Sequence, residues 1–102
     1  MDRIAKLREL LMVNPSDSFL QHALALEYIK LGDDETAREL FQGLLKGDPA
    51  YVGSYYHLGK LFERRNDPTE AIKWYEKGMA AAKQAGDNHA WNELKGAFDE
   101  LI

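Results

Sequence analysis

Three histidines have the most versatile side chains in this sequence, because imidazole titrates near neutral pH and can bind a metal ion. They are His22, His57 and His89, and each lies in a segment with helical apolar spacing. Together they could form an acid-responsive patch, or two of them could hold a divalent metal ion. The third interpretation is that three ordinary polar surface positions hold histidine. Since the three histidines lie in different predicted helices, we predict no metal site.

The sequence lacks the motifs that would build a catalytic or cofactor-binding centre. It contains no G-x-S-x-G, no H-E-x-x-H, no phosphate-binding loop and no dinucleotide-binding glycine pattern. Gly59 and Lys60 lack the upstream glycine and the following hydroxyl of a phosphate loop. Cysteine is absent, so disulfide and thiolate chemistry are excluded. We therefore predict that the chain is not an enzyme and binds no cofactor.

The composition favours one globular domain and excludes several kinds of partner. Of the 102 residues, 45% are hydrophobic and 29% are charged, which is typical of a folded chain. The formal charge is -4 with acidic and basic residues mixed throughout, so we expect no nucleic-acid partner. No apolar run approaches the roughly 20 residues of a membrane span. We expect a complete chain beginning at Met1, without a targeting segment, and a cytoplasmic location.

Start and stop signals predict short helices joined by short loops. Asp67 and Pro68 form an acidic N-cap and a first-turn proline, with Glu70 at the capping-box position. Gly32 and Asn66 end apolar helical patterns and can adopt the left-handed conformation of a helix C-terminus. Further signals of the same kinds are Pro15, Asp17, Asp33, Pro49, Gly86 and Asp87. Because the loops are short, consecutive helices must run antiparallel.

Comparable side chains return at an interval of 34 residues. The matched pairs are Pro15 and Pro49, Leu24 and Leu58, Tyr28 and Phe62, Ala37 and Ala71, and Phe41 and Tyr75. This pattern resembles the tetratricopeptide repeat, a helix-turn-helix unit that stacks into a solenoid. The fuller copy runs from Tyr55 to Gly59 and matches the aromatic-x-x-Leu-Gly core of that repeat. The resemblance covers nearly the whole chain.

The resemblance implies an all-α fold, a right-handed α-α superhelix of six helices. Two full repeats, 18–51 and 52–85, would be flanked by an N-terminal half repeat, 1–15, and a C-terminal capping helix, 87–102. Together these segments would form one domain over 1–102. The positions expected to be small where the helices of a hairpin approach each other are Ala25, Ala37, Gly59 and Ala71.

Three positions depart from the repeat pattern. Leu44 stands where the repeat usually has alanine, which predicts a locally wider helix separation. Gly78 stands at the same position of the second copy, and there we predict a helix weakened by roughly 0.5 to 1 kcal/mol relative to alanine. Lys95 replaces the glycine of the last first-helix pattern, which suits a terminal helix with one face in water.

The resemblance also implies a function, namely the binding of a peptide or partner protein in a concave groove. The candidate groove residues are Phe19, His22, Leu26, Ile29, Tyr56, His57, Lys60, Glu63, Arg64 and His89. Some members of the family grip the C-terminal carboxylate of heat-shock chaperones with a clamp of lysine, asparagine and arginine. The related places here hold His22, Leu26, His57, His89 and Glu93. Since the clamp is not preserved, that chaperone role is not expected.

The sequence is also compatible with a second function. With only two full repeats, exposed apolar residues could pair with another copy, which would make the chain a homodimeric structural protein. The apolar side chains of Phe19 and Leu26 fit either interpretation, because they could also simply cover the first half repeat.

Overall fold

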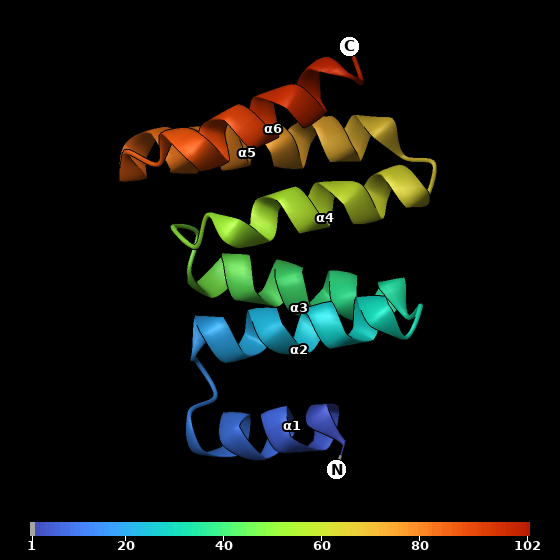
Figure 1. The fold of residues 1–102 in the computed structure, drawn as a ribbon, viewed down its shortest axis with the longest axis vertical. Coiled ribbons are helices and arrows are strands. Elements are labelled where there is room, and N and C mark those ends of the chain that lie inside the picture. The colour runs from blue at the N-terminus through green and yellow to red at the C-terminus, as the bar shows by residue number, and fades with distance from the viewer. Residues whose placement is uncertain (1) are drawn as a thin grey trace. The chain divides into compact units, whose positions relative to one another are not determined.

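The computed structural model describes residues 2–102, whose regular structure consists of six α-helices without a strand (Figure 1). The helices are α1 Arg3–Val13, α2 Ser18–Lys30, α3 Asp34–Gly47, α4 Gly53–Arg64, α5 Pro68–Ala85 and α6 Asn88–Asp99. The predicted all-α fold with six helices is confirmed. No helix in this part of the chain is long and apolar enough to span a membrane.

The helices fall into two compact units that meet in sequence at Asp48 and Pro49. Unit 1 contains α1, α2 and α3, and unit 2 contains α4, α5 and α6. Within each unit, consecutive helices run antiparallel (Figure 1). The repeat boundaries and the single domain over 1–102 stay predictions.

Aspartate side chains begin most of the helices. The carboxylates of Asp17, Asp33, Asp67 and Asp87 accept hydrogen bonds of 3.0 to 3.1 Å from backbone N–H groups in the first turns of α2, α3, α5 and α6. These bonds satisfy donors that have no partner inside the helix. The predicted caps are thus confirmed. The exception is α4, where Val52 occupies the N-cap position and provides no side-chain bond.

Left-handed residues end three helices, as predicted. Gly32, Asn66 and Gly86 have φ angles of 80°, 60° and 71°. After each of them, the next aspartate donates its backbone N–H to a carbonyl in the last turn of the preceding helix, over 2.9 Å. The same aspartate then caps the following helix. One residue therefore closes one helix and opens the next, which explains why these loops are so short.

The core of unit 1 lies on both sides of α2. Leu7 from α1 packs with Ala23 and Leu24 of α2, and Leu40 from α3 adjoins this cluster. In the hairpin of α2 and α3, Ala25 and Ala37 are completely buried. The two ends of this hairpin are also joined by a side-chain bond, because the hydroxyl of Ser18 donates to the Asp48 carboxylate over 2.6 Å.

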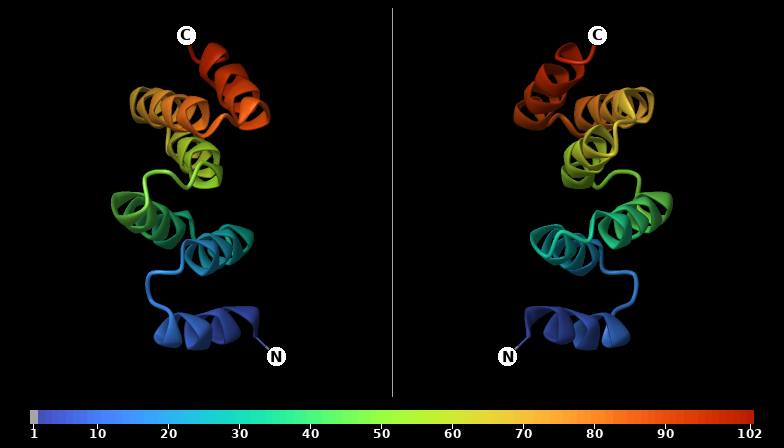
Figure 2. Two further views of the ribbon diagram at one scale, coloured as in Figure 1. Left: turned by 90° about the vertical axis from the view of Figure 1, so that its left-hand side faces the viewer. Right: turned by 90° about the vertical axis from the view of Figure 1, so that its right-hand side faces the viewer.

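In unit 2, all three helices contact one another (Figure 2). Tyr75 on α5 is completely buried and its ring lies against Gly59 of α4. A Cβ atom at position 59 would lie 2.1 Å from Cε1 of Tyr75. Real Cβ atoms essentially never lie within 3.0 Å of a non-bonded heavy atom. The expectation that Gly59 permits a close approach of two helices is met.

Gly78 has a packing role that the sequence does not predict. A Cβ atom at position 78 would lie 2.6 Å from Cβ of Tyr55 on α4 and 3.0 Å from both methyl groups of Leu94 on α6. Gly78 thus allows α5 to pack closely against both neighbouring helices. The interpretation of this glycine as a weak point of its helix was incomplete, because the missing side chain makes room for Tyr55 and Leu94.

Candidate functional site

Four predicted groove residues lie on one face of α2 in unit 1. This α2 face consists of Phe19, His22, Leu26 and Ile29. Phe19 is 65% exposed, and the other three are partly buried. The His22 ring meets the buried Phe41 ring of α3 edge-on, with 5.5 Å between centroids. His22 therefore serves the packing of its hairpin, and Phe19 is the most accessible apolar side chain of the face.

Five predicted groove residues lie on α4 in unit 2. This α4 face consists of Tyr56, His57, Lys60, Glu63 and Arg64. The ammonium of Lys60 lies 5.4 Å from the centroid of the Tyr56 ring, within the range of a cation–π contact. It also lies 3.5 Å from the carboxylate of Glu63. The structure thus brings three predicted residues into one connected group.

Glu63 is hydrogen-bonded to a residue in the buried core of the same unit. It accepts a hydrogen bond from the hydroxyl of Tyr75, whose ring lies 6.3 Å from the ring of Tyr56. Burial, together with the bond to Glu63, raises the pKa of the Tyr75 phenol above its ordinary value. Tyr75 therefore remains protonated and acts as a fixed donor to Glu63 at neutral pH. This contact orients the carboxylate that pairs with Lys60.

The two histidines of unit 2 lie in different environments that share one carboxylate. Burial lowers the pKa of His57, the negative charge of Glu93 raises it, and the positive charge of Arg64 lowers it. His89 on α6 has an 87% exposed side chain, with its Nε2 atom 3.8 Å from Glu93. Within residues 2–102, no three His, Cys, Asp or Glu side chains form a group suited to holding a metal ion.

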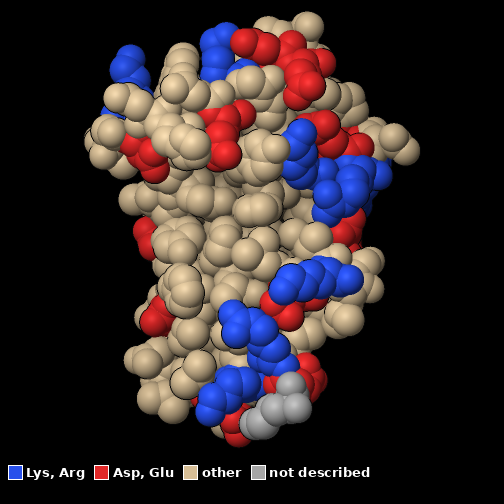
Figure 3. All heavy atoms as spheres, in the orientation of Figure 1, with Lys and Arg blue, Asp and Glu red and all other residues tan. Residues whose placement is uncertain are grey.

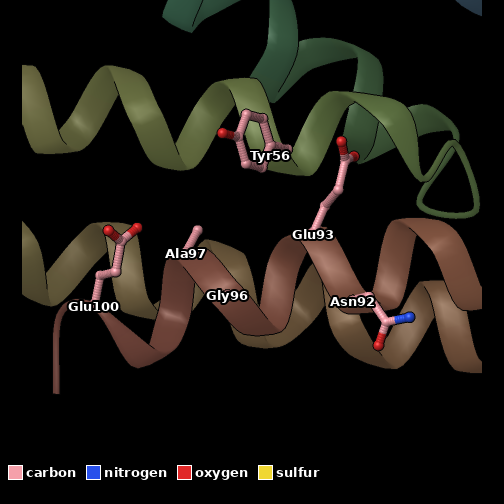
Figure 4. Close-up of a pocket in the computed structure, with 6 residues that line it drawn as sticks. All are labelled: Tyr56, Asn92, Glu93, Gly96, Ala97 and Glu100. Carbon is pink, nitrogen blue, oxygen red and sulfur yellow. The ribbon is translucent and has the colours of Figure 1, made fainter.

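An open cavity of about 390 Å³ lies beside Tyr56, between α4 and α6. It is lined by Tyr56, Asn92, Glu93, Gly96, Ala97 and Glu100. Figure 4 shows the side chains of Glu93 and Glu100 extending from α6 toward the side on which α4 lies. Gly96 and Ala97 carry little or no side chain, so the space between these carboxylates stays open.

Most of the residues lining this cavity are absent from the predicted groove set. Tyr56 is the one residue that belongs both to the cavity lining and to the predicted groove set. Asn92, Gly96 and Glu100 are not predicted from the sequence. A signal was present, because Trp91 follows Tyr55 by 36 positions and begins the same apolar stripe. At that offset, Asn92, Glu93, Gly96 and Glu100 correspond to Tyr56, His57, Lys60 and Arg64. The residues of α6 therefore occupy the helical positions that carry the α4 face.

The charges around these faces are mixed. On the side of the molecule drawn in Figure 3, lysine and arginine side chains lie next to aspartate and glutamate side chains. The α4 face contributes both signs, whereas the cavity beside it contributes carboxylates. Such an arrangement can bind an aromatic, polar or charged group of a partner by stacking, hydrogen bonding and charge.

Comparisons with known proteins agree with the fold. A family model described as tetratricopeptide repeat matches residues 22–88. The chain is 31% identical over 91 residues to a TPR repeat-containing protein of Pseudomonas aeruginosa, covering 89% of this chain and 87% of that protein. It is also 26% identical over 82 residues to the aspartyl/asparaginyl beta-hydroxylase of Mus musculus. That match covers 80% of this chain but only 11% of the hydroxylase.

Solved structures resemble the chain over most of its length. A crystal structure of a tetratricopeptide repeat domain protein from Salinibacter ruber has a TM-score of 0.80 at 40% identity, covering 83% of this chain and 94% of that one. The solution structure of a protein from Bordetella parapertussis has a TM-score of 0.84 at 25% identity, covering 99% and 88%. The chain belongs to the tetratricopeptide repeat family, whose fold supports protein–protein interaction.

Proposed function

We propose that this chain is a non-enzymatic interaction module that binds a peptide or a partner protein through the α4 face and the adjoining cavity. One observation carries the proposal. Tyr56 lies where a cation–π contact, a charged pair and an open cavity of about 390 Å³ meet. A half-buried tyrosine beside such a cavity offers apolar area and a polar group to a partner, as in protein interfaces.

The α2 face belongs to the same proposal. Its apolar residues Phe19, Leu26 and Ile29 suit the anchoring of apolar side chains of a partner. The remaining groove candidates, His22, His57 and His89, take part in this proposal as polar neighbours. A partner with one or two apolar residues and some charged ones would match this chemistry.

Binding fits the described residues of unit 2 better than catalysis does. The carboxylate and the phenol that could transfer protons there, Glu63 and Tyr75, are hydrogen-bonded to each other. Tyr75 is completely buried, so a substrate cannot reach its hydroxyl. A cytoplasmic location is also part of the proposal, because a chain without cysteine suits a reducing compartment, and fractionation of the native cells tests it.

Affinity capture from a native lysate tests this function. The parent chain is compared with the double variant Tyr56→Ala and Lys60→Ala, and with a control that carries Glu76→Ala and Lys83→Ala on exposed positions of α5. The expected result is that specific partners bind to the parent and the control but not to the double variant. Equal recovery of the same partners by all three proteins would overturn the assignment of the α4 face.

Self-assembly is a second candidate, supported by exposed apolar residues in unit 1. Met12 and Val13 at the end of α1 are 83% and 77% exposed, and Phe19 follows in the first turn of α2. Burying these side chains against a second copy would favour a dimer. Light scattering at micromolar concentration tests this candidate. A strict monomer, or a dimer unaffected by Val13→Ser and Phe19→Ser, would reject it.

A further inference from the structure

The cavity between α4 and α6 combines features that favour a cationic group. Its walls carry the ring of Tyr56 and the carboxylates of Glu93 and Glu100, and no lysine or arginine lines it. Asn92 also lines the cavity, but its amide points away from Tyr56 (Figure 4). The two carboxylates and the aromatic ring thus line the same open cavity in unit 2.

The two carboxylates of the cavity are only weakly compensated within the protein. Among the residues that the structure describes, none forms an ion pair with Glu100. Glu93 lies 3.8 Å from His89 and acts through its charge on His57, and an imidazole is positively charged only when it is protonated. Glu63 is different, because it pairs with Lys60 and accepts the Tyr75 hydroxyl bond. Glu93 and Glu100 therefore keep acceptor capacity for a ligand.

The ring of Tyr56 already accepts a cation. Lys60 lies 5.4 Å from its centroid, close to the outer limit of about 6 Å for a cation–π contact. A ligand cation in the cavity would have to approach the part of this ring that Lys60 does not cover. The pairing of Lys60 with Glu63 reduces the repulsion between the two positive charges.

We infer that this cavity binds the guanidinium group of an arginine in a partner peptide. Guanidinium fits better than ammonium because it is planar, stacks on aromatic rings and offers paired N–H groups to carboxylates. Tyr56 supplies the ring, and Glu93 and Glu100 supply the acceptors. This inference rests on the proposed function and names the chemistry of the partner.

Nuclear magnetic resonance with three blocked peptides tests the inference directly. The ¹⁵N-labelled full chain is titrated with acetyl-Gly-Gly-Arg-Gly-Gly-amide and with the same peptide carrying citrulline, which keeps the shape of arginine but lacks its charge. The arginine peptide is expected to shift the backbone signals of Asn92, Gly96 and Glu100, and to bind several-fold more tightly than the citrulline peptide. A lysine peptide is expected to bind more weakly than the arginine peptide. Equal binding of the arginine and citrulline peptides would overturn the inference.

Matched variants assign the binding to the carboxylates. The double variant Glu93→Gln and Glu100→Gln keeps the size of both side chains. Loss of the charge-assisted bonds is expected to lower the affinity for the arginine peptide roughly tenfold. The control Glu76→Gln removes one negative charge from α5, outside the cavity, and is expected to leave the affinity for the arginine peptide unchanged. Dispersed spectra of all variants show that they are folded. Unchanged affinity in the double variant would overturn the site.

Failure here is distinguishable from failure of the proposed function. If the arginine peptide does not bind but capture of partners still depends on Tyr56 and Lys60, this inference is wrong and the proposed function stands. If the peptide does not bind and capture does not depend on those residues, both are wrong. If the peptide binds through Glu93 and Glu100, the chemistry of the cavity is established independently of any lysate.

Discussion

Gly59 and Tyr75 are in direct contact across the hairpin of α4 and α5, at a distance that leaves no room for a methyl group. A Cβ atom at position 59 would lie 2.1 Å from Cε1 and 2.6 Å from Cδ1 and Cζ of the ring. The ring cannot easily move aside, because it is completely buried and its hydroxyl is bonded to Glu63. The close packing of α4 against α5 and the hydrogen bond from Tyr75 to Glu63 therefore depend on Gly59.

The substitution Gly59→Ala is expected to destabilise the protein. Alanine is the better helix former by about 1 kcal/mol, but overpacking a core costs about 1 to 3 kcal/mol and here displaces a bonded ring. The net loss should lower the midpoint of urea unfolding followed by circular dichroism. Gly43→Ala is the matched control, since a Cβ atom there meets nothing within 4 Å. It should stabilise α3 by about 0.5 to 1 kcal/mol. A gain in stability from both substitutions would contradict this account.

Gly78→Ala separates the packing interpretation from helix propensity. Propensity alone predicts a gain, whereas the contact of 2.6 Å with Cβ of Tyr55 predicts a loss of about 1 to 3 kcal/mol. The Cβ of Tyr55 is fixed to the backbone of α4, so it cannot turn away as the methyl groups of Leu94 can. Urea unfolding measures the sign. If Gly78→Ala raises the midpoint, the close approach of α5 to α4 is not a requirement of the fold.

Local signals explain what the sequence could predict. The caps at Asp33, Asp67 and Asp87 and the left-handed Gly32 and Gly86 act within a few residues of themselves. Their effect can therefore be predicted from neighbouring residues, and the helices begin and end accordingly. The interval of 34 residues then identified the repeat.

Contacts between distant residues explain what the sequence did not predict. The role of Gly78 depends on Tyr55 and Leu94, which belong to two other helices. The cavity depends on how α6 lies against α4, which decides that Glu100 shares a space with Tyr56. The chemistry of imidazole makes His89 a candidate from the sequence, yet its exposed ring lies outside the lining of the cavity. The groove set as a whole remains a prediction.

Tyr75→Phe is expected to make stability less dependent on pH in alkaline solution. Burial and Glu63 raise the pKa of Tyr75 above its ordinary value of 10.0. The folded state thus holds this proton more tightly than the unfolded state does. The resulting stabilisation is fully present below about pH 10 and is lost as the pH rises toward the higher pKa of the folded state. The Tyr75→Phe variant has no such proton, so it does not lose this part of its stability as the pH rises.

Urea midpoints at about pH 8 and about pH 11 measure the effect of Tyr75→Phe. At the lower pH the variant should be less stable by about 1 kcal/mol, because Glu63 loses a hydrogen bond. The difference from the parent should shrink at the higher pH. Tyr56→Phe, in a half-buried ring of the α4 face, is the matched control. A constant difference at both values would show that the Tyr75 proton is not linked to folding.

Two charged residues act on the pKa of His57 in opposite directions. Burial keeps the pKa of His57 below its ordinary value of 6.5, Glu93 raises it and Arg64 lowers it. Glu93→Gln should therefore lower this pKa further, and Arg64→Gln should raise it. Titration of the imidazole ¹⁵N signals, with His57→Gln for assignment, measures both changes. Because the folded pKa is lowered, the neutral ring stabilises the fold above pH 6.5, and this contribution is lost as the pH falls through the folded pKa.

Opposite directions are the decisive feature of this pair of variants. A general loosening of α4 or α6 would expose His57 and raise its pKa toward 6.5 in both variants, since burial is the largest cause of its shift. A direct effect of charge must instead move the pKa down without Glu93 and up without Arg64. Shifts of the same sign would mean that Glu93 does not act on His57 across the space between α4 and α6. They would then also count against the placement of its carboxylate at the cavity beside Tyr56.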